Sequence, residues 1–280
     1  MAPPRVRVFI GSGEASRLER KTFIHSLRKN SKRDLELYVF NGTHNAVEPV
    51  DGGEPLPASM SLKAKYTNVT EFSNYRFLIP QLCNHEGRAI YVDSDMIALG
   101  DIGELFDVDL AGADFLAKAE AYGGSTEARW GLSVALFDCA KCRFDLDRYV
   151  DEIEQGLYTF ADMHQMTEKF LAHHPFTIGP IDPKWNEFDR YDDRTKLIHY
   201  TNLSTQPWRF PGHSCGDLWF RYFEEARRAG VVTDRDIELS LLRGAVRSDI
   251  LQGNNPTPRR TARRRVLSRL PLVRRIFSRG

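Results

Sequence analysis

The chain has 280 residues, of which 41% are hydrophobic and 28% are charged. These fractions are typical of an ordinary globular protein and exclude a disordered, collagenous or membrane-spanning chain. A chain of this length can bury enough apolar surface to form one large α/β domain. We expect such a domain over residues 1–253, with a tail after it.

Charge is divided unevenly between these two parts. The formal net charge of the whole chain is +1, but residues 254–280, here called the basic tail, contain nine arginines and no acidic residue. Residues 1–253 therefore carry a formal net charge of −8. This asymmetry predicts a binding partner for the basic tail rather than for the whole protein.

The sequence predicts a cytoplasmic protein with reduced thiols. The N-terminus lacks the apolar segment of a secretory signal, and no run of about 18 apolar residues occurs anywhere. Cys139 and Cys142 have a spacing found in redox and zinc sites, but Cys83 and Cys215 stand alone and supply no second ligand pair. Structural thiols are the favoured interpretation, with metal or redox use as the alternative.

The N-terminal segments predict the opening of an α/β unit. Residues 5–10 alternate polar and apolar side chains as a strand does, residues 11–13 form a glycine turn, and residues 14–30 have helical periodicity. A second strand is expected over residues 35–40. The Gly- and Pro-rich residues 48–58 predict a surface loop.

An apolar strand in the middle of the chain leads directly into an acidic triplet. Ser73 can cap a short helix that extends to Leu82, and residues 89–92 then form a continuous apolar run, typical of a strand buried on both faces. The run ends at Asp93. Residues 101–104 have the spacing of a capping box and predict another short helix.

Strands and helices continue to alternate towards the basic tail. Two further strands are expected over residues 132–137 and 196–200. The expected helices span residues 144–155, 162–172, 217–228 and 234–242. Such alternation indicates an α/β fold with one mostly parallel, helix-covered sheet, whose ligands bind beyond the carboxyl ends of its strands.

Asp93 and Asp95 are the candidate metal ligands. They stand two residues apart after the apolar strand, so in extended backbone both carboxylates can face the same way and share a divalent cation. The same Asp-x-Asp spacing recurs at residues 107–109, 145–147 and 234–236, where solvated surface or helix capping explains it. A polar strand end that caps the next turn is the alternative for the first pair.

The sequence around this pair resembles the core of the family-eight glycosyltransferases, which have the GT-A type of nucleotide-sugar fold. The central motif is RAIYVDSDM at residues 88–96. The other segments that carry the resemblance are residues 72–80, 101–106, 184–186, 198–201 and 206–208. It implies a metal-dependent glycosyltransferase that uses a nucleotide-sugar donor, commonly a UDP-sugar, and retains the anomeric configuration.

The resemblance also implies how the metal is held. It assigns a divalent cation, Mn²⁺ or else Mg²⁺, to Asp93, Asp95 and His199, with Asp95 at the catalytic centre. Taken alone, a histidine after an apolar strand is more often a packing or surface residue. Two carboxylates and one imidazole form a mixed oxygen and nitrogen site, which suits manganese better than magnesium.

Further residues are placed at the donor and acceptor site by the same resemblance. Gly11 and Ser12 would approach the nucleotide, and Arg76 would contact the nucleotide or diphosphate, with an ion pair within a helix or between helices as its alternative. Gln165, Trp185 and Asn186 would form the sugar and acceptor pocket, with Gln165 as a catalytic residue and with a packing role as the alternative for Trp185. Trp208, in the late segment of the resemblance, would bind the donor.

Two departures from the family pattern predict a divergent branch. Gln206 stands where the family has a diphosphate-contacting lysine, with Arg209 nearby, and Gly131-Leu132-Ser133 stands where the family has Asn-x-Gly. A catalytically inactive nucleotide-sugar binding or assembly protein is therefore the alternative function. A nucleotidyltransferase fits less well, because Glu14 rather than a basic residue follows the glycine turn.

The basic tail predicts an amphipathic helix that can lie on an anionic membrane. Its apolar residues at helical spacing are Val266, Leu270, Val273 and Phe277. We therefore expect peripheral docking on the inner face of the membrane, with a glycan or a lipid-linked saccharide as acceptor. A solvated tail is the alternative, and nucleic-acid binding is disfavoured because the rest of the chain is acidic and has no recognition motif.

Overall fold

A computed structural model describes residues 4–41, 46–66, 70, 72–120 and 129–254, apart from the side chains of Asn41 and Tyr66. The amphipathic helix expected in the basic tail lies outside these residues. Within them, no helix is both long and apolar enough to cross a membrane. The four cysteines are free and buried.

The centre of the fold is an eight-stranded sheet in the order β4-β3-β2-β1-β5-β8-β7-β9. Its strands are β1 (Val6–Ser12), β2 (Leu35–Asn41), β3 (Ala46–Pro49), β4 (Leu56–Pro57), β5 (Arg88–Asp93), β7 (Phe115–Glu120), β8 (Arg129–Asp138) and β9 (Ile178–Pro180). The pairings make six of the eight strands point the same way, with β3 and β8 opposed. The expected α/β fold with a mostly parallel sheet is confirmed.

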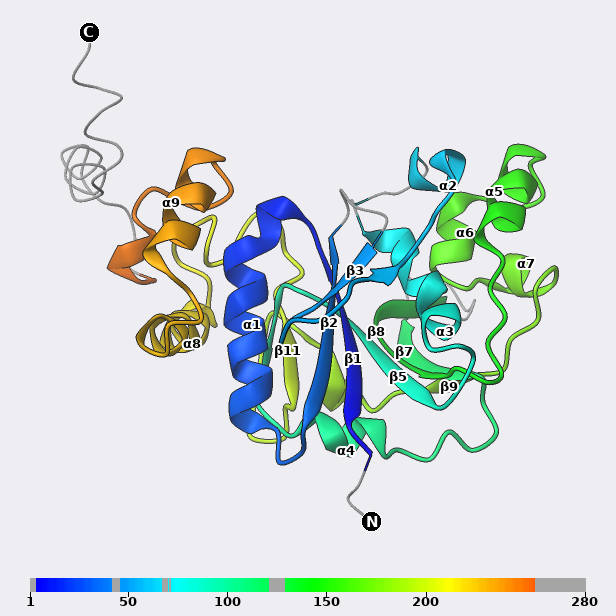
Figure 1. Ribbon diagram of the computed structural model, residues 1–280, viewed down its shortest axis with the longest axis horizontal. Helices are drawn as coiled ribbons and strands as arrows, with labels where there is room; N and C mark the ends of the chain where they lie inside the picture. Colours follow the sequence, from blue (N-terminus) through cyan, green and yellow to red (C-terminus); the bar gives the residue numbers. More distant parts are fainter. Residues whose placement is uncertain (1–3, 42–45, 67–69, 71, 121–128, 255–280) are drawn as a thin grey trace, which may run out of the picture.

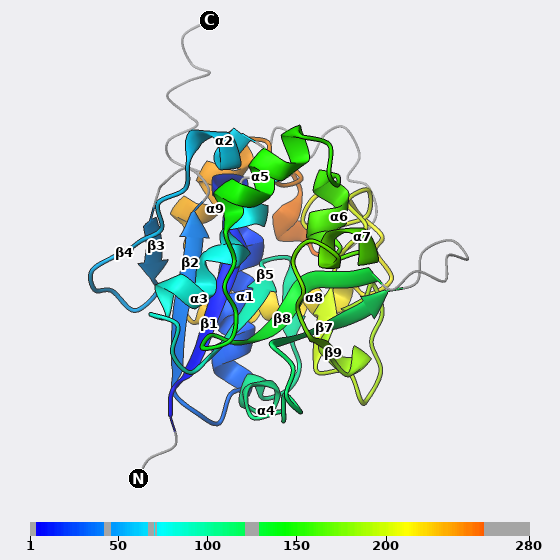
Figure 2. The ribbon, with the colours of Figure 1, turned by 90° about the vertical axis from the view of Figure 1, so that its right-hand side faces the viewer.

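Helices cover both faces of this sheet (Figures 1 and 2). The helices of the described residues are α1 (Arg17–Asn30), α2 (Leu62–Tyr66), α3 (Ile79–Leu82), α4 (Ile102–Phe106), α5 (Leu146–Glu154), α6 (Phe160–His164), α7 (Glu168–Leu171), α8 (Gly216–Arg228) and α9 (Asp234–Leu242). Of these, α8 and α9 pack on α1 rather than on the large sheet. Short 3-10 turns are η1 (Glu14–Ser16), η2 (Ser73–Leu78), η3 (Pro183–Trp185) and η4 (Ile250–Gln252).

Alternate residues of the strands supply a separate core on each face. Phe9 and Tyr91 point to the face covered by α5, α6 and α7. Their neighbours Val8 and Ile90 point to the opposite face, where α1 packs through Phe23 and other apolar residues. This period of two explains why the middle strands are apolar throughout.

A smaller sheet lies beside the large one and assembles the site. It has the order β10-β11-β6, from β10 (Glu187–Phe188), β11 (Leu197–His199) and β6 (Met96–Ala98). The strand expected over residues 196–200 is therefore β11, in a second sheet. In the antiparallel β11–β6 register His199 pairs with Met96, which brings the histidine beside Asp95.

Three local expectations differ from the structure. The helix expected over residues 162–172 is divided into α6 and α7, because Met166 between them has a φ of +46°, which no α-helix accommodates. Residues 73–82 are mostly 3-10 helix, and Phe72 rather than Ser73 precedes it, with no side-chain cap. The expected loop over residues 48–58 includes the end of β3 and the whole of β4.

Candidate active site

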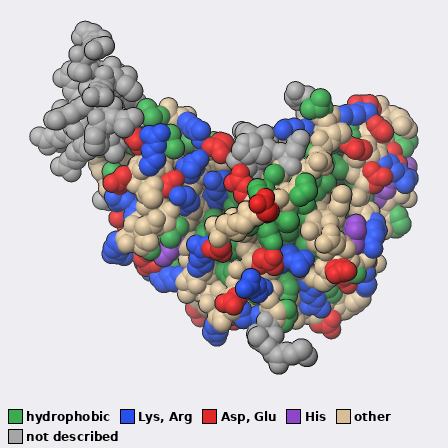
Figure 3. Space-filling view, viewed as in Figure 1, with side chains coloured by type: hydrophobic (Ala, Val, Ile, Leu, Met, Phe, Trp, Pro, Cys, Tyr) green, Lys and Arg blue, Asp and Glu red, His purple; other side chains and the backbone are tan. Residues whose placement is uncertain are grey.

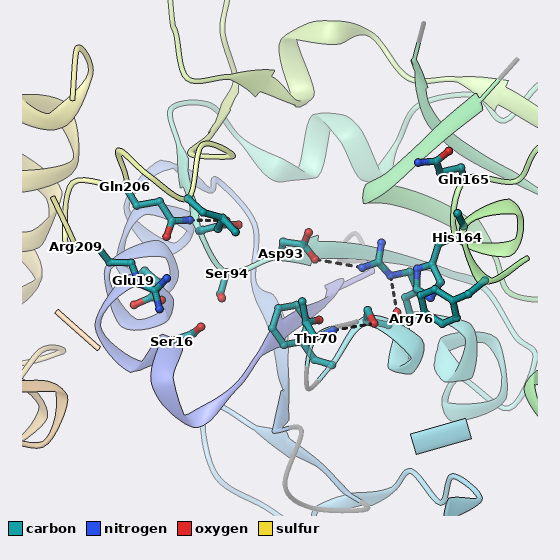
Figure 4. Close-up of a pocket in the computed structure, with 16 residues that line it drawn as sticks. Ser16, Glu19, Thr70, Arg76, Asp93, Ser94, His164, Gln165, Gln206 and Arg209 are labelled. Atoms are coloured by element: carbon teal, nitrogen blue, oxygen red, sulfur yellow. Dashed lines mark hydrogen bonds and ion pairs between the residues drawn. The ribbon is translucent and has the colours of Figure 1, made fainter. Parts of the chain in front are cut away.

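A cavity of about 540 Å³ opens at the carboxyl ends of β1 and β5. Its walls come from the start of α1, the segment before η2, the end of β5, α6 and the loop after β11. Figure 3 shows the surface hollowed at this edge, and Figure 4 shows the lining side chains. The position agrees with the rule that ligands of α/β sheets bind beyond the carboxyl ends of strands.

Asp93, Asp95 and His199 form a cluster at this edge. Each offers a ligand atom, and these atoms all lie within 4.8 Å of one another. Asp93 is the last residue of β5, Asp95 precedes β6, and His199 is the last residue of β11. Among the described residues, this is the cluster of Asp, Glu, His or Cys side chains that lie close enough together in space to hold a metal ion.

The donor atoms fit a divalent cation. His199 Nε2 lies 3.0 Å from Asp95 Oδ1, yet that oxygen is buried and makes no well-formed hydrogen bond to any described residue. A buried oxygen without a hydrogen-bond partner is costly in a native structure unless another group satisfies it. A divalent cation between the imidazole and the carboxylate would do so, because carboxylate oxygens and a neutral imidazole nitrogen are both metal ligands.

The electrostatic environment of Asp93 also favours a bound cation. Burial and the nearby Asp95 carboxylate raise the pKa of Asp93, and the opposing Arg76 guanidinium, with NH2 3.7 Å from Oδ1, does not fully offset them. Tyr91 OH donates a hydrogen bond of 2.6 Å to the same oxygen. Because the two carboxylates disfavour each other's charged forms, a cation there would stabilise both.

The environment of His199 is set by the same carboxylates. Burial lowers the pKa of His199, but the carboxylates of Asp95 and Asp93 raise it by more, so the net shift is upward. A divalent cation would compete with that added proton, as expected for an imidazole ligand. The other ring nitrogen, Nδ1, lies 3.0 Å from the side-chain oxygen of Asn186.

Arg76 lies on the cavity wall, and its ion-pair partner is Asp93 at the end of β5 rather than a residue of a helix. Its guanidinium stacks 4.6 Å from the centre of the Tyr91 ring, Nε donates to the Ser73 carbonyl at 2.8 Å, and NH2 faces Asp93. Burial and the neighbouring Arg76 lower the pKa of His164 well below its usual value. His164 is therefore neutral, and its Nε2 lies 2.8 Å from Asn74 Oδ1.

Gly11 and Ser12 are one layer behind the cavity and do not line it. A Cβ at Gly11 would lie 2.1 Å from Tyr91 OH and 2.7 Å from a ring carbon of Phe72, so glycine is needed here for packing. Ser12 Oγ accepts a hydrogen bond of 2.9 Å from Arg20. Both residues support the wall that carries the site.

The remaining candidates separate into one that lines the cavity and three that do not. Gln165 lines it, and its Oε1 accepts a 2.9 Å hydrogen bond from Arg129. Trp185 and Trp208 are almost fully buried in two different hydrophobic cores. Asn186 is fully buried against His199.

Gln206 and Arg209 lie in the loop after β11. This is the segment in which the family that the sequence resembles has its diphosphate-contacting lysine. Gln206 Nε2 donates to Asp95 Oδ2 at 3.2 Å and to the Tyr200 carbonyl at 3.0 Å. Arg209 follows one turn later, with its backbone N–H bonded to the Gln206 carbonyl, and it also lines the cavity. Figure 4 shows both on the same side of the cavity as Glu19.

Glu19 is a site residue that the sequence analysis missed. It lies in α1 and lines the cavity with 6% of its surface exposed, and its Oε2 has no hydrogen-bond partner among the described residues. Burial raises its pKa to about 7. A signal was present, because Glu19 stands four residues before the apolar Phe23 and therefore on the packed face of the helix.

Three solved structures share this fold, and all are glycosyltransferases. The galactosyltransferase LgtC, in complex with donor and acceptor sugar analogues, superposes with a TM-score of 0.60 at 14% identity, over 84% of this chain and 100% of LgtC. The bifunctional glycosyltransferase WbbM gives 0.57 at 14% identity, over 85% and 52%. GlyE of Streptococcus pneumoniae gives 0.56 at 15% identity, over 87% and 65%. The fold is therefore that of the GT-A glycosyltransferases.

Sequence comparison is more specific. Residues 17–146 match the family model described as glycosyl transferase family 8. Glycosyltransferase GlyB of Streptococcus pneumoniae is 25% identical over 176 residues, which are 55% of this chain and 43% of GlyB. Protein CDI of Arabidopsis thaliana is 24% identical over 248 residues, 78% of this chain and 86% of CDI. Over slightly less than half of its length the chain is therefore similar to the family-eight glycosyltransferases, and the aligned part spans less than half the length of GlyB.

Proposed function

We propose that the protein is a metal-dependent glycosyltransferase that moves a sugar from a nucleotide-sugar donor to an acceptor. The observation that carries this proposal is the Asp93, Asp95 and His199 cluster at the edge of the cavity. The acidic side chains stand at the end of a central strand, where the glycosyltransferase fold binds its ligands.

The residues of the cavity have distinct tasks in this proposal. A bound cation, Mn²⁺ or Mg²⁺, would neutralise charge that develops on the departing nucleoside diphosphate. Asp93, Asp95 and His199 would hold that cation. Arg76 and Arg209 add positive charge on either side of the cluster, so the diphosphate can be oriented from both ends of the cavity.

The finer assignments follow the family resemblance. The donor is a UDP-sugar, the anomeric configuration is retained, and the acceptor is a glycan or lipid-linked saccharide. Gln165, which lines the cavity beyond Arg76, would contact the sugar side of the donor together with Asp95. Gly11 and Ser12 would support the cavity wall against which the nucleotide binds. Trp185 and Trp208 would support the site from the two hydrophobic cores in which they are buried.

Two observations favour an inactive nucleotide-sugar binding protein as the second candidate. Gln206 Nε2 is bonded to Asp95 Oδ2 at 3.2 Å, so this carboxylate oxygen already has a donor. Gln165 is likewise held by Arg129. If these contacts persist when a nucleotide sugar enters, the protein binds the donor without turnover.

The basic tail supports a membrane-docking proposal. Nine arginines with no acidic residue can bind an anionic surface, with each basic side chain near it contributing about 1 kcal/mol. Docking on the inner face would place the protein at the membrane that carries lipid-linked acceptors.

Calorimetric titration tests the proposed function. UDP is titrated into the protein with and without Mn²⁺, and the titration is repeated on Asp95→Ala. We expect Mn²⁺-dependent binding of UDP that is lost in this variant, because one of three metal ligands is gone. The matched control is Asp109→Ala, since this exposed aspartate also belongs to an Asp-x-Asp pair but lies outside the cavity.

Turnover distinguishes the two candidate functions. Release of UDP from a UDP-sugar in the presence of acceptors indicates a transferase, whereas tight binding with no release indicates the inactive binding protein. Absence of UDP binding with Mn²⁺ would refute both.

A further inference from the structure

His199 is held from behind by the side chain of Asn186. The ring nitrogen Nδ1 lies 3.0 Å from Asn186 Oδ1, while Nε2 faces Asp95. A side-chain amide oxygen only accepts hydrogen bonds, so Nδ1 must carry the proton in this contact. In neutral His199 the lone pair is then on Nε2, the nitrogen directed at the metal cluster.

Asn186 is itself fixed by contacts on its other side. It is fully buried, and its Nδ2 donates a 2.9 Å hydrogen bond to Ser133 Oγ in β8. Its backbone carbonyl accepts a 2.6 Å hydrogen bond from Lys118 Nζ in β7. Asn186 is thus anchored to two strands of the large sheet, although His199 belongs to the small one.

Aromatic packing completes this support. Phe188, two residues after Asn186, meets the His199 ring edge-on with centroids 5.5 Å apart. Lys118 Nζ lies 3.4 Å from the centre of the Phe188 ring. In the register of β10 and β11, Phe188 also pairs directly with His199. These contacts fix the ring plane, and the Asn186 amide fixes which nitrogen is protonated.

We propose that Asn186 is a positioning residue that sets the tautomer and orientation of His199 for the cation. The sequence placed Asn186 in the sugar pocket, but it does not line the cavity and so acts through His199. The inference rests on the proposed metal site. Outer partners of metal-bound histidines typically change metal affinity by about 10- to 100-fold when removed.

The test is the affinity of the protein for Mn²⁺ in the presence of UDP, measured from the electron paramagnetic resonance signal of free Mn²⁺. Asn186→Leu removes the acceptor for Nδ1 at similar side-chain volume. We expect it to weaken Mn²⁺ binding at least about tenfold. Asn186→Asp keeps an oxygen facing Nδ1 and is expected to stay within about threefold of wild type.

Two further variants separate positioning from packing. Ser133→Ala removes only the distant anchor of the amide, and we expect a loss smaller than that of Asn186→Leu. Thermal melting reports whether each variant folds, and Asn186→Ala replaces Asn186→Leu if the leucine is not accommodated. The ratio of affinities between Asn186→Leu or its replacement and Asn186→Asp is the decisive quantity.

The outcomes are distinguishable from failure of the proposed function. Equal Mn²⁺ affinity in wild type and the folded leucine or alanine variant would overturn the positioning role. Equal losses in Asn186→Leu and Asn186→Asp would overturn it too, because retention of an acceptor would then have no effect. A wild-type protein that binds no Mn²⁺ would instead refute the metal site and the inference with it.

Discussion

At the scale of single residues, Glu19 links the cavity to the stability of the fold. Its carboxyl group is buried with a pKa of about 7, against 4.5 for an ordinary glutamic acid. Between these two values the unfolded chain loses the Glu19 proton while the folded chain keeps it. The free energy of unfolding therefore falls as the pH rises from 4.5 to 7.

This argument predicts the behaviour of Glu19→Gln. We expect the variant and wild type to have similar stability near pH 4.5, and the variant to be more stable by on the order of 1–3 kcal/mol at pH 8. Urea unfolding at both pH values measures the difference. Glu86→Gln, at an exposed position, is the control, and a difference that does not change with pH would contradict the buried-acid interpretation.

Arg209 offers a second prediction at this scale. If it supplies the positive charge that Gln206 lacks, Arg209→Ala should weaken UDP binding about tenfold, in the range of one charge-assisted hydrogen bond. Arg209→Lys should recover part of the loss, because lysine keeps the charge but not the fork of donors. Calorimetry gives both values.

The matched control is Arg190→Ala, an exposed arginine paired with Glu187 outside the cavity. Unchanged UDP affinity in Arg209→Ala would show that this arginine does not contact the diphosphate.

At the scale of secondary-structure elements, the pairing of β1 with β5 requires a residue without a side chain at position 11. Gly11 pairs with Asp93 in the sheet, and a Cβ there would collide with Tyr91 OH and Phe72. Gly11→Ala should therefore lower the free energy of unfolding by about 1–3 kcal/mol, as overpacked cores do. Chemical denaturation measures this change.

The hydroxyl group can be tested by a double-mutant cycle. Tyr91→Phe removes the atom that lies closest to the added methyl, so Gly11→Ala should cost less in the Tyr91→Phe background. Additive effects would show that Phe72 or the backbone, and not the tyrosine hydroxyl, limits this position.

Elements with strong local patterns could be predicted from the sequence. The periodicity identified α1, α8 and α9, and the apolar run identified β5 with Asp93 at its end. The strand β7 was missed, and the α6–α7 break depends on the backbone of Met166, which no composition signal marks.

The site was predictable only in part for a related reason. Asp93 and Asp95 follow from the strand that precedes them, but His199 reaches them through the register of β11 on β6, a long-range pairing. The proposed role of Asn186 depends on a different pairing, that of β10 with β11, which places Phe188 opposite His199. Local pattern does not encode such contacts, so only the family resemblance pointed to His199.

At the scale of the whole molecule, the separation of acidic and basic residues along the chain predicts which part of the protein binds a membrane. Residues 1–253 are acidic and the basic tail carries nine arginines. Deletion of residues 259–280 should abolish co-sedimentation with vesicles that contain anionic lipid, because the arginines are the source of the attraction. Raising the salt concentration should also release the 280-residue chain from these vesicles.

Vesicles of neutral lipid are the control, and neither form of the protein should bind them. Equal binding of the 280-residue chain and the shortened chain to anionic vesicles would remove the membrane role of the basic tail.

The Asp93, Asp95 and His199 cluster joins residues that lie about a hundred positions apart in the sequence. Asp93 ends β5 of the large sheet, Asp95 directly precedes β6 of the small sheet, and His199 ends β11, which pairs with β6. A cation bound to all three acts as a cross-link that closes this long loop, and its binding energy is added to the stability of the folded chain. Binding of the cation and attachment of β11 to the connection between β5 and β6 would then be one equilibrium, so loss of the metal would weaken this part of the fold as well as stop the proposed chemistry.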